Sequence, residues 1–120
     1  MDELAQVLDR EQRQLELLLF RLVSARQLSA AGETRFLPWA AAEVERTLER
    51  VHEAELVRAV VTDRLAAYLA LDAERVTLGD LAELAGEPVR TVLLEHRATF
   101  LRLLAEIDEA TRWFRLVAAA

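Results

Sequence analysis

The chain has 120 residues, of which 53% are hydrophobic, and its formal net charge is -6 because 21 acidic residues outnumber 15 basic ones. This length suits one domain with a single core. The negative balance disfavours nucleic acid and anionic membrane as default partners, and without cysteine there is neither a disulfide nor a thiolate nucleophile. No apolar run approaches the roughly 20 residues of a membrane span. The acidic N-terminus also lacks the basic start of a secretory signal, so we expect a cytoplasmic protein with no membrane insertion.

The first predicted element is an amphipathic helix over residues 2–30, where leucines recur at three-, four- and seven-residue spacing. Gly32 follows the last periodic residues and can adopt the left-handed conformation that ends a helix. Leu17, Leu19 and Phe20 extend the apolar stripe nearly all round the middle of this helix. We therefore expect that stretch to be covered on more than one side.

A second helix is predicted over residues 38–71, with Pro38 at its first position, where the missing N–H costs nothing. Its apolar seam has the period of a helix and is interrupted by Arg58. A helix of thirty residues spans about 45 Å. The two helices should therefore form a long antiparallel hairpin.

The remaining segments are a short helix over residues 78–85 and a long one over residues 88–117. Thr77 is the expected N-cap of the short helix, with Asp80 in the capping-box position. Gly86 ends that helix, and Pro88 opens the long one.

The predicted fold is all-α. It consists of a long antiparallel helical hairpin plus a third long helix, forming a three-helix bundle or coiled coil, with one short corner helix. Residues 1–120 are expected to make up a single helical domain.

Two residue patterns bear on catalytic or metal sites. Glu49 and His52 have the Glu-x-x-His spacing of carboxylate-bridged metal bundles, but such sites need a second copy, and His96 has Leu93 three residues before it. Neither serine has a histidine in register to activate it. We therefore expect no enzyme activity, no catalytic residue, no metal and no cofactor. His52 is expected to be solvated, and His96 to lie in the helix seam with one hydrogen bond.

A DNA-binding pattern is also present in the last third of the chain. Ala82, Gly86 and Val92 reproduce the spacing of a helix-turn-helix. Glu87 replaces the usual apolar turn residue, and the acidic balance opposes phosphate binding. DNA binding is therefore the least favoured reading, and the alternative is a corner helix packed on the hairpin.

The aromatic residues near the two ends of the bundle leave two readings open. Adjacent helix positions point about 100° apart, so Phe114 on the apolar stripe places Trp113 at its edge or outside it. Trp39 raises the same question at the start of the second helix. These rings either plug the ends of the bundle or contact a partner.

Five short motifs follow one another along the chain in a characteristic order. They are Gly-Glu at 32–33, Glu-Val-Glu at 43–45, Glu-Ala-Glu-Leu-Val-Arg-Ala at 53–59, Thr-Leu-Gly-Asp-Leu at 77–81 and Glu-His-Arg at 95–97. With the leucine-rich first helix, this order resembles the FlgN family of flagellar export chaperones over nearly the whole chain.

The resemblance implies a cytosolic chaperone that keeps the hook-filament junction proteins, which are hook-associated proteins, unassembled and delivers them to the flagellar type III secretion apparatus. In the family the C-terminal helix binds the client, and residues 103–117 correspond to it here. Family members often carry asparagines in this region and extend further, whereas this chain has Thr111, Arg112 and Trp113 and stops at Ala120.

A client helix could pack along the last helix, apolar face to apolar face. The residues expected to form this partner-binding surface are Leu104, Ile107, Thr111, Trp113 and Phe114. An alternative from another class is a self-associating coiled coil, a homo-oligomer whose excess apolar surface is covered by an identical copy.

Overall fold

The computed structural model describes residues 2–119, and within this range the fold is all-α, as predicted. The long helices are α1 (Asp2–Ala30), α2 (Leu37–Tyr68) and α4 (Val89–Ala119). A short 3₁₀ turn, η1 (Thr34–Phe36), precedes α2, and the short helix α3 (Leu78–Ala85) precedes α4. The long hairpin, the third long helix and the short corner helix are therefore all present.

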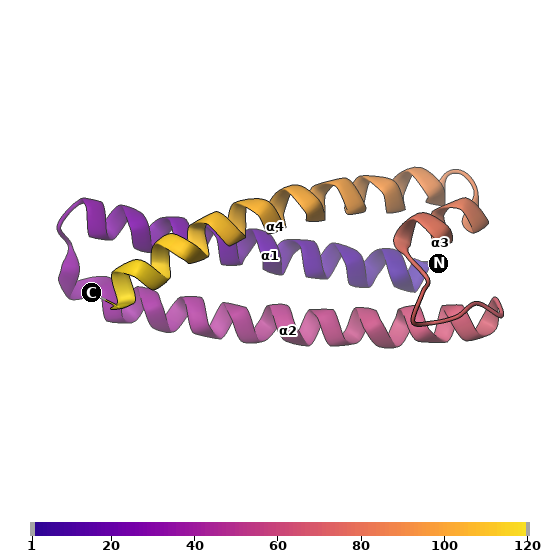
Figure 1. Cartoon of the computed structure of the whole chain (residues 1–120), viewed down its shortest axis with the longest axis horizontal. Coiled ribbons are helices and arrows are strands. Elements are labelled where there is room, and N and C mark those ends of the chain that lie inside the picture. Colours follow the sequence, from indigo (N-terminus) through magenta and orange to yellow (C-terminus); the bar gives the residue numbers. More distant parts are fainter. Residues whose placement is uncertain (1, 120) are drawn as a thin grey trace.

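The three long helices form an open arrangement in which α1 is central. Helix α2 runs back along α1 in the antiparallel direction, and α4 runs in the same direction as α1 (Figure 1). Helix α1 contacts both of its neighbours, whereas within residues 2–119 no Cα atom of α2 lies within 8 Å of one in α4. The molecule measures 54 × 22 × 21 Å with a radius of gyration of 17.2 Å, against about 14 Å for a compact domain of this length.

The core follows from the leucine stripe of α1, which is buried from one end of the helix to the other. Leu4, Leu8 and Leu22 are among the most completely buried side chains of the protein. Valines at helical spacing in α2 and apolar residues of α4 pack onto the same stripe. These partners are Val44, Val51 and Val61 of α2 and Leu93, Phe100 and Leu103 of α4.

Helix α1 ends as its sequence predicts. Gly32 has a φ of 76°, its N–H donates to the carbonyl of Ser29 at 3.1 Å, and the N–H of Glu33 donates to the carbonyl of Leu28 at 2.9 Å. These two bonds satisfy carbonyls that the end of the helix would otherwise leave unpaired. The chain can then turn tightly into η1 and α2.

The end of α2 differs from the prediction, because the helix stops at Tyr68, three residues before Leu71. Ala70 takes the left-handed conformation with a φ of 57°. The N–H of Leu71 donates to the carbonyl of Ala66 at 2.7 Å, and that of Ala70 donates to the carbonyl of Ala67 at 3.2 Å. This is the same two-bond closure as at Gly32, built on a residue that carries a Cβ.

Smaller differences occur at the two prolines. Helix α2 begins at Leu37, so Pro38 occupies its second position, and α4 begins at Val89, one residue after Pro88. Helix α4 continues to Ala119, two residues beyond the predicted end. In each case the proline still lies where no intrahelical N–H donor is required.

The capping box of α3 is confirmed. The N–H of Asp80 donates to Thr77 Oγ1 at 3.1 Å, and the N–H of Thr77 donates to Asp80 Oδ2 at 3.0 Å. Gly86 follows α3 with a φ of 68°, and α3 then packs on α4 as the corner piece. This reciprocal pairing fixes the start of a helix too short to be stable by itself.

We expect the substitution Ala70→Gly to stabilise the protein. A left-handed conformation costs a residue with a Cβ about 1–2 kcal/mol, and the greater freedom of glycine in the unfolded chain offsets about 0.5–1 kcal/mol of the gain. The free energy of unfolding should therefore rise by about 0.5–1 kcal/mol in a urea titration. The matched control is Ala59→Gly at an exposed interior position of α2, which should lose about 1 kcal/mol. Destabilisation by Ala70→Gly would contradict this account.

Candidate protein-binding surfaces

The five residues expected to bind a partner all lie in the C-terminal half of α4, but they do not form one open face. Four of them, Leu104, Ile107, Thr111 and Phe114, fall within an arc of about 80°, and Trp113 lies about 100° beyond Phe114. Leu104 is 49% exposed. Ile107 and Phe114 are half-buried and pack against the core, so part of this stripe holds the bundle together.

Trp113 and Phe114 nevertheless line one pocket at the end of the bundle. Its volume is about 390 Å³, and Ala25 of α1 contributes to its wall. Residues at the start of α2, including Pro38, complete it. The two rings reach the same pocket because α4 crosses α1 here toward the start of α2 (Figure 1). The guanidinium of Arg26 lies 5.6 Å from the centroid of the Trp113 ring, a cation–π geometry.

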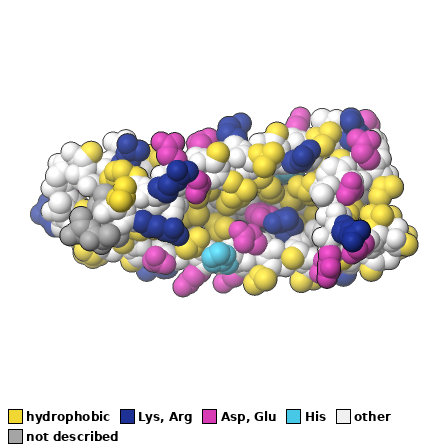
Figure 2. All heavy atoms as spheres, viewed as in Figure 1, with side chains coloured by type: hydrophobic (Ala, Val, Ile, Leu, Met, Phe, Trp, Pro, Cys, Tyr) yellow, Lys and Arg dark blue, Asp and Glu magenta, His cyan; other side chains and the backbone are white. Residues whose placement is uncertain are grey.

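The separation of α2 from α4 leaves apolar side chains visible between them. Figure 2 shows hydrophobic side chains gathered in the middle of this face, between the two helices, with acidic and basic side chains among them. On α4, Leu101 and Leu104 are exposed. Their three-residue spacing places them on the same side of the helix. The edge of α4 that contains Leu101 and Leu104 is called the α4 edge below.

Arg58, which interrupts the seam of α2, is paired with Glu11 of α1. Arg58 Nε donates to Glu11 Oε2 at 2.6 Å, and the carboxylate is buried while the guanidinium remains about one-third exposed. Burial raises the pKa of Glu11 above its ordinary value, and the charge and hydrogen bond of Arg58 oppose that rise. This ion pair lets two charged residues occupy a position between two packed helices.

The two histidines occupy the environments that their positions predict. His96 Nδ1 lies 2.9 Å from Gln12 Oε1, which joins α4 to α1. His52 is exposed, and its Nδ1 lies 3.5 Å from a carboxylate oxygen of Glu55. In the part of the chain that the structure describes, no three His, Asp or Glu side chains are grouped so as to hold a metal ion.

The turn of the hairpin carries a patch of exposed aromatic residues. Phe20 is 59% exposed and Trp39 is 72% exposed, and Val23 of α1 is also exposed. The middle of α1 is covered on two sides, by α2 and α4, as expected, and Leu17 and Leu19 are half-buried there, but Phe20 lies on the side that remains open. Helices α2 and α4 occupy other sides of α1, and the described chain has no further helix to cover this one. We call Phe20, Val23, Leu28, Phe36 and Trp39 the hairpin-tip patch.

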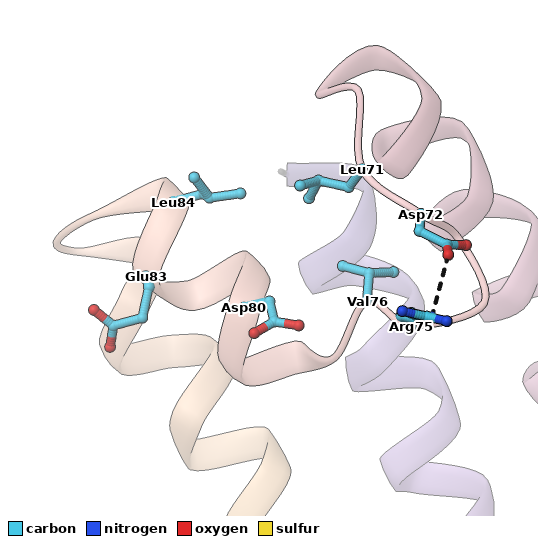
Figure 3. Close-up of a pocket in the computed structure, with 7 residues that line it drawn as sticks. All are labelled: Leu71, Asp72, Arg75, Val76, Asp80, Glu83 and Leu84. Carbon is cyan, nitrogen blue, oxygen red and sulfur yellow. Dashed lines mark ion pairs between the residues drawn. The ribbon is translucent and has the colours of Figure 1, made fainter.

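Another hollow lies at the opposite end of the molecule, beside α3. Leu71, Val76 and Leu84 give it an apolar lining, with Leu71 and Leu84 facing each other across it (Figure 3). Its polar rim already has partners: Asp72 lies 3.5 Å from Arg75. Asp80 closes the capping box, and Glu83 lies 3.1 Å from Arg90. Because these groups serve the fold, the pocket offers less to a ligand than the α4 edge or the hairpin-tip patch.

The region that matches a helix-turn-helix is acidic on its outer side. Ala82 is buried against α4, as such a motif requires. Arg90, in the first turn of α4, is bracketed by Glu83 at 3.1 Å and Glu87 at 3.5 Å. Its positive charge is therefore neutralised locally, which opposes an approach to DNA phosphates.

Comparisons of the chain with known protein families, with curated proteins and with solved structures find no match. Within residues 2–119, no helix is both long enough and apolar enough to cross a membrane.

We expect Arg58→Met to lower the free energy of unfolding by about 3 kcal/mol at pH 7, because it leaves the carboxylate of Glu11 buried and unpaired. This drop in the free energy of unfolding should become smaller as the pH falls toward 4.5, because Glu11 is then increasingly protonated. The raised pKa lets folded Glu11 keep its proton to a higher pH than unfolded Glu11, so stability from this group falls as the pH rises above 4.5. Urea titrations from pH 4.5 to 8 measure this dependence.

The matched control is the double variant Glu11→Leu/Arg58→Met, which removes both charges. It should be at least as stable as the unmodified protein at pH 7, because an apolar pair avoids the desolvation of two ions. A loss in Arg58→Met that stays the same at every pH would contradict the role assigned to Glu11.

Proposed function

We propose that this chain is a cytoplasmic export chaperone of the FlgN type. It binds a hook-filament junction protein through α4, prevents its premature assembly and delivers it to the flagellar export apparatus. One observation carries the proposal: in the described chain α4 packs against α1 and α3, and its Cα atoms stay more than 8 Å from those of α2, which leaves the α4 edge exposed along the helix expected to bind the client. The resemblance of the motif order supports the choice of client.

A client helix laid along the α4 edge would first meet Leu101 and Leu104. The half-buried side chains of Ile107, Thr111 and Phe114 continue the surface toward the end of the helix. A stable interface buries about 1,200–2,000 Å² in total, so two leucines do not suffice and several turns of α4 must take part. A helix of 31 residues, about 46 Å long, provides that length.

The proposal requires neither catalysis nor a cofactor. Helix-in-groove recognition depends on the burial of apolar area and on shape, with charged side chains at the margin setting orientation. The charged side chains among the apolar ones between α2 and α4 (Figure 2) suit this margin.

Self-association is the second candidate, and a specific observation favours it. Leu56, Val60 and Tyr68 on the outer side of α2 are exposed, in addition to the α4 edge. An identical copy could cover such residues in an isologous dimer. The mass of the protein alone in solution separates this candidate from the first.

We expect Leu104→Asp to weaken binding of a junction protein from the same genome at least tenfold, with helicity unchanged. A charge placed in a desolvated apolar contact removes more than about 1.4 kcal/mol of binding free energy, and Leu104 is exposed enough for the fold to tolerate the change. Isothermal titration calorimetry measures the affinity, and circular dichroism measures the helicity. Asp at Ile107 or Phe114 would instead disturb the core.

The matched control is Leu56→Asp, which adds the same charge to an exposed leucine on the outer side of α2 and should leave the affinity unchanged. Equal binding by Leu104→Asp and the unmodified protein would refute the α4 edge as the client site. A homo-oligomer of the protein alone that Leu104→Asp dissociates would favour self-association.

A further inference from the structure

The hairpin-tip patch contains two adjoining hollows that together make a continuous apolar surface. The first lies between α1 and α2 and has a volume of about 280 Å³; Phe36 and Trp39 line it. The second runs along α1 past Phe20 and Val23 and has a volume of about 670 Å³. Both hollows share Ser24 and Leu28, so a single ligand can occupy both. No residue of α4 lines either of them.

The shape of the patch comes from small residues set among large ones. Ser24 and Ala40 contribute little side-chain volume to the first hollow, whereas Phe36 and Trp39 form a wall, with ring centroids 6.0 Å apart. A depression of this kind receives an apolar side chain from a partner helix as a knob enters a hole. The second hollow extends the surface to Ala31, so the distance from Phe20 is about 17 Å along α1, or three helical turns.

The charge at the hairpin tip differs from that of the rest of the chain. Residues 20–47 contain four arginines and three glutamates, so this segment is net positive in a chain with a net charge of -6. The side chain of Arg35 is 78% exposed and has a carboxylate partner only at 3.8 Å. Its guanidinium lies 4.6 Å from the centroid of the Phe36 ring, which holds a positive charge at the edge of the aromatic surface.

We propose that the hairpin-tip patch is a docking site for an amphipathic α-helix of another protein, in which acidic residues flank bulky apolar anchors. The anchors enter the two hollows, and the acidic residues pair with Arg35 at the rim, because Arg21 already lies 3.6 Å from Glu43. The site lies outside the α4 edge and does not depend on the client assigned to that edge. A chaperone with both surfaces could hold a client and a second protein at the same time.

Charge decides between this partner and two others. An isologous second copy would bring two net positive segments together and gain no attraction. An anionic membrane surface would be repelled by the rest of the molecule, which is net negative outside the patch. An acidic helix gains attraction at the patch, and it is small enough to avoid the acidic remainder of the chain.

The test uses the full chain and a designed probe. The probe is a fluorescein-labelled 18-residue peptide with leucines at i, i+3, i+4 and i+7 and glutamates on the flanks, and its binding is followed by fluorescence anisotropy. We expect a dissociation constant in the micromolar range. A peptide with lysine in place of every glutamate should bind at least tenfold more weakly, and Arg35→Glu should reduce this preference for the acidic peptide.

The variant Phe20→Ser/Trp39→Ser should bind the acidic peptide at least tenfold more weakly. Leu84→Ser, at an exposed leucine of α3, is the matched control and should bind normally. Leu104→Asp should also bind normally, which separates this site from the proposed client site.

Four results would overturn the proposal. The first is equal binding of the acidic and basic peptides, and the second is unchanged binding by Phe20→Ser/Trp39→Ser. Another is a dimer of the unmodified protein that this double variant dissociates, which would assign the patch to a second copy. The last is tighter binding to phosphatidylglycerol vesicles than to the acidic peptide, which would assign it to a membrane.

Discussion

The structure depends on the buried face of α1, because this one helix holds both of its neighbours. Its leucines lie against α2 on one side and α4 on the other, and in residues 2–119 no Cα atom of α2 lies within 8 Å of one in α4. In a closed three-helix bundle each helix would cover part of the other two. Here the α4 edge is left without a neighbour, so the same constraint that builds the core also creates the candidate binding surface.

Features of the fold that rest on local chemistry could be predicted from the sequence, and those that rest on tertiary packing could not. Gly32 and the capping box of Thr77 each carry a residue type whose conformation or side chain specifies the helix end. Ala70 adopts a left-handed conformation that its own chemistry disfavours. Leu69 and Leu71, on either side of it, pack against the core. Their burial outweighs the local preference, and the sequence contains no signal for it.

The apolar residues of the candidate site could be predicted from the sequence, but their burial or exposure could not, because it depends on tertiary packing. Helical periodicity identifies apolar stripes, but it does not say which stripe lies against a neighbour and which faces water. Ile107 and Leu104 belong to one stripe, yet the former packs on the core and the latter is exposed. Phe20 and Trp39 are apolar by sequence, but their exposure follows from the positions of α2 and α4. Arg58 stood out as an interruption, whereas its partner Glu11 is 47 residues away.

The two surfaces differ in how binding to them should affect the bundle. The α4 edge belongs to a helix that packs on α1 and, near its start, on α3. A client helix that packs on its C-terminal half adds a neighbour there and should stabilise α4 in place. The hairpin-tip patch belongs to α1, η1 and α2, which Gly32 and the short turn already hold together. A partner there meets a surface formed before binding, and little conformational entropy is lost on docking. Occupation of the patch therefore leaves α4 available to a client.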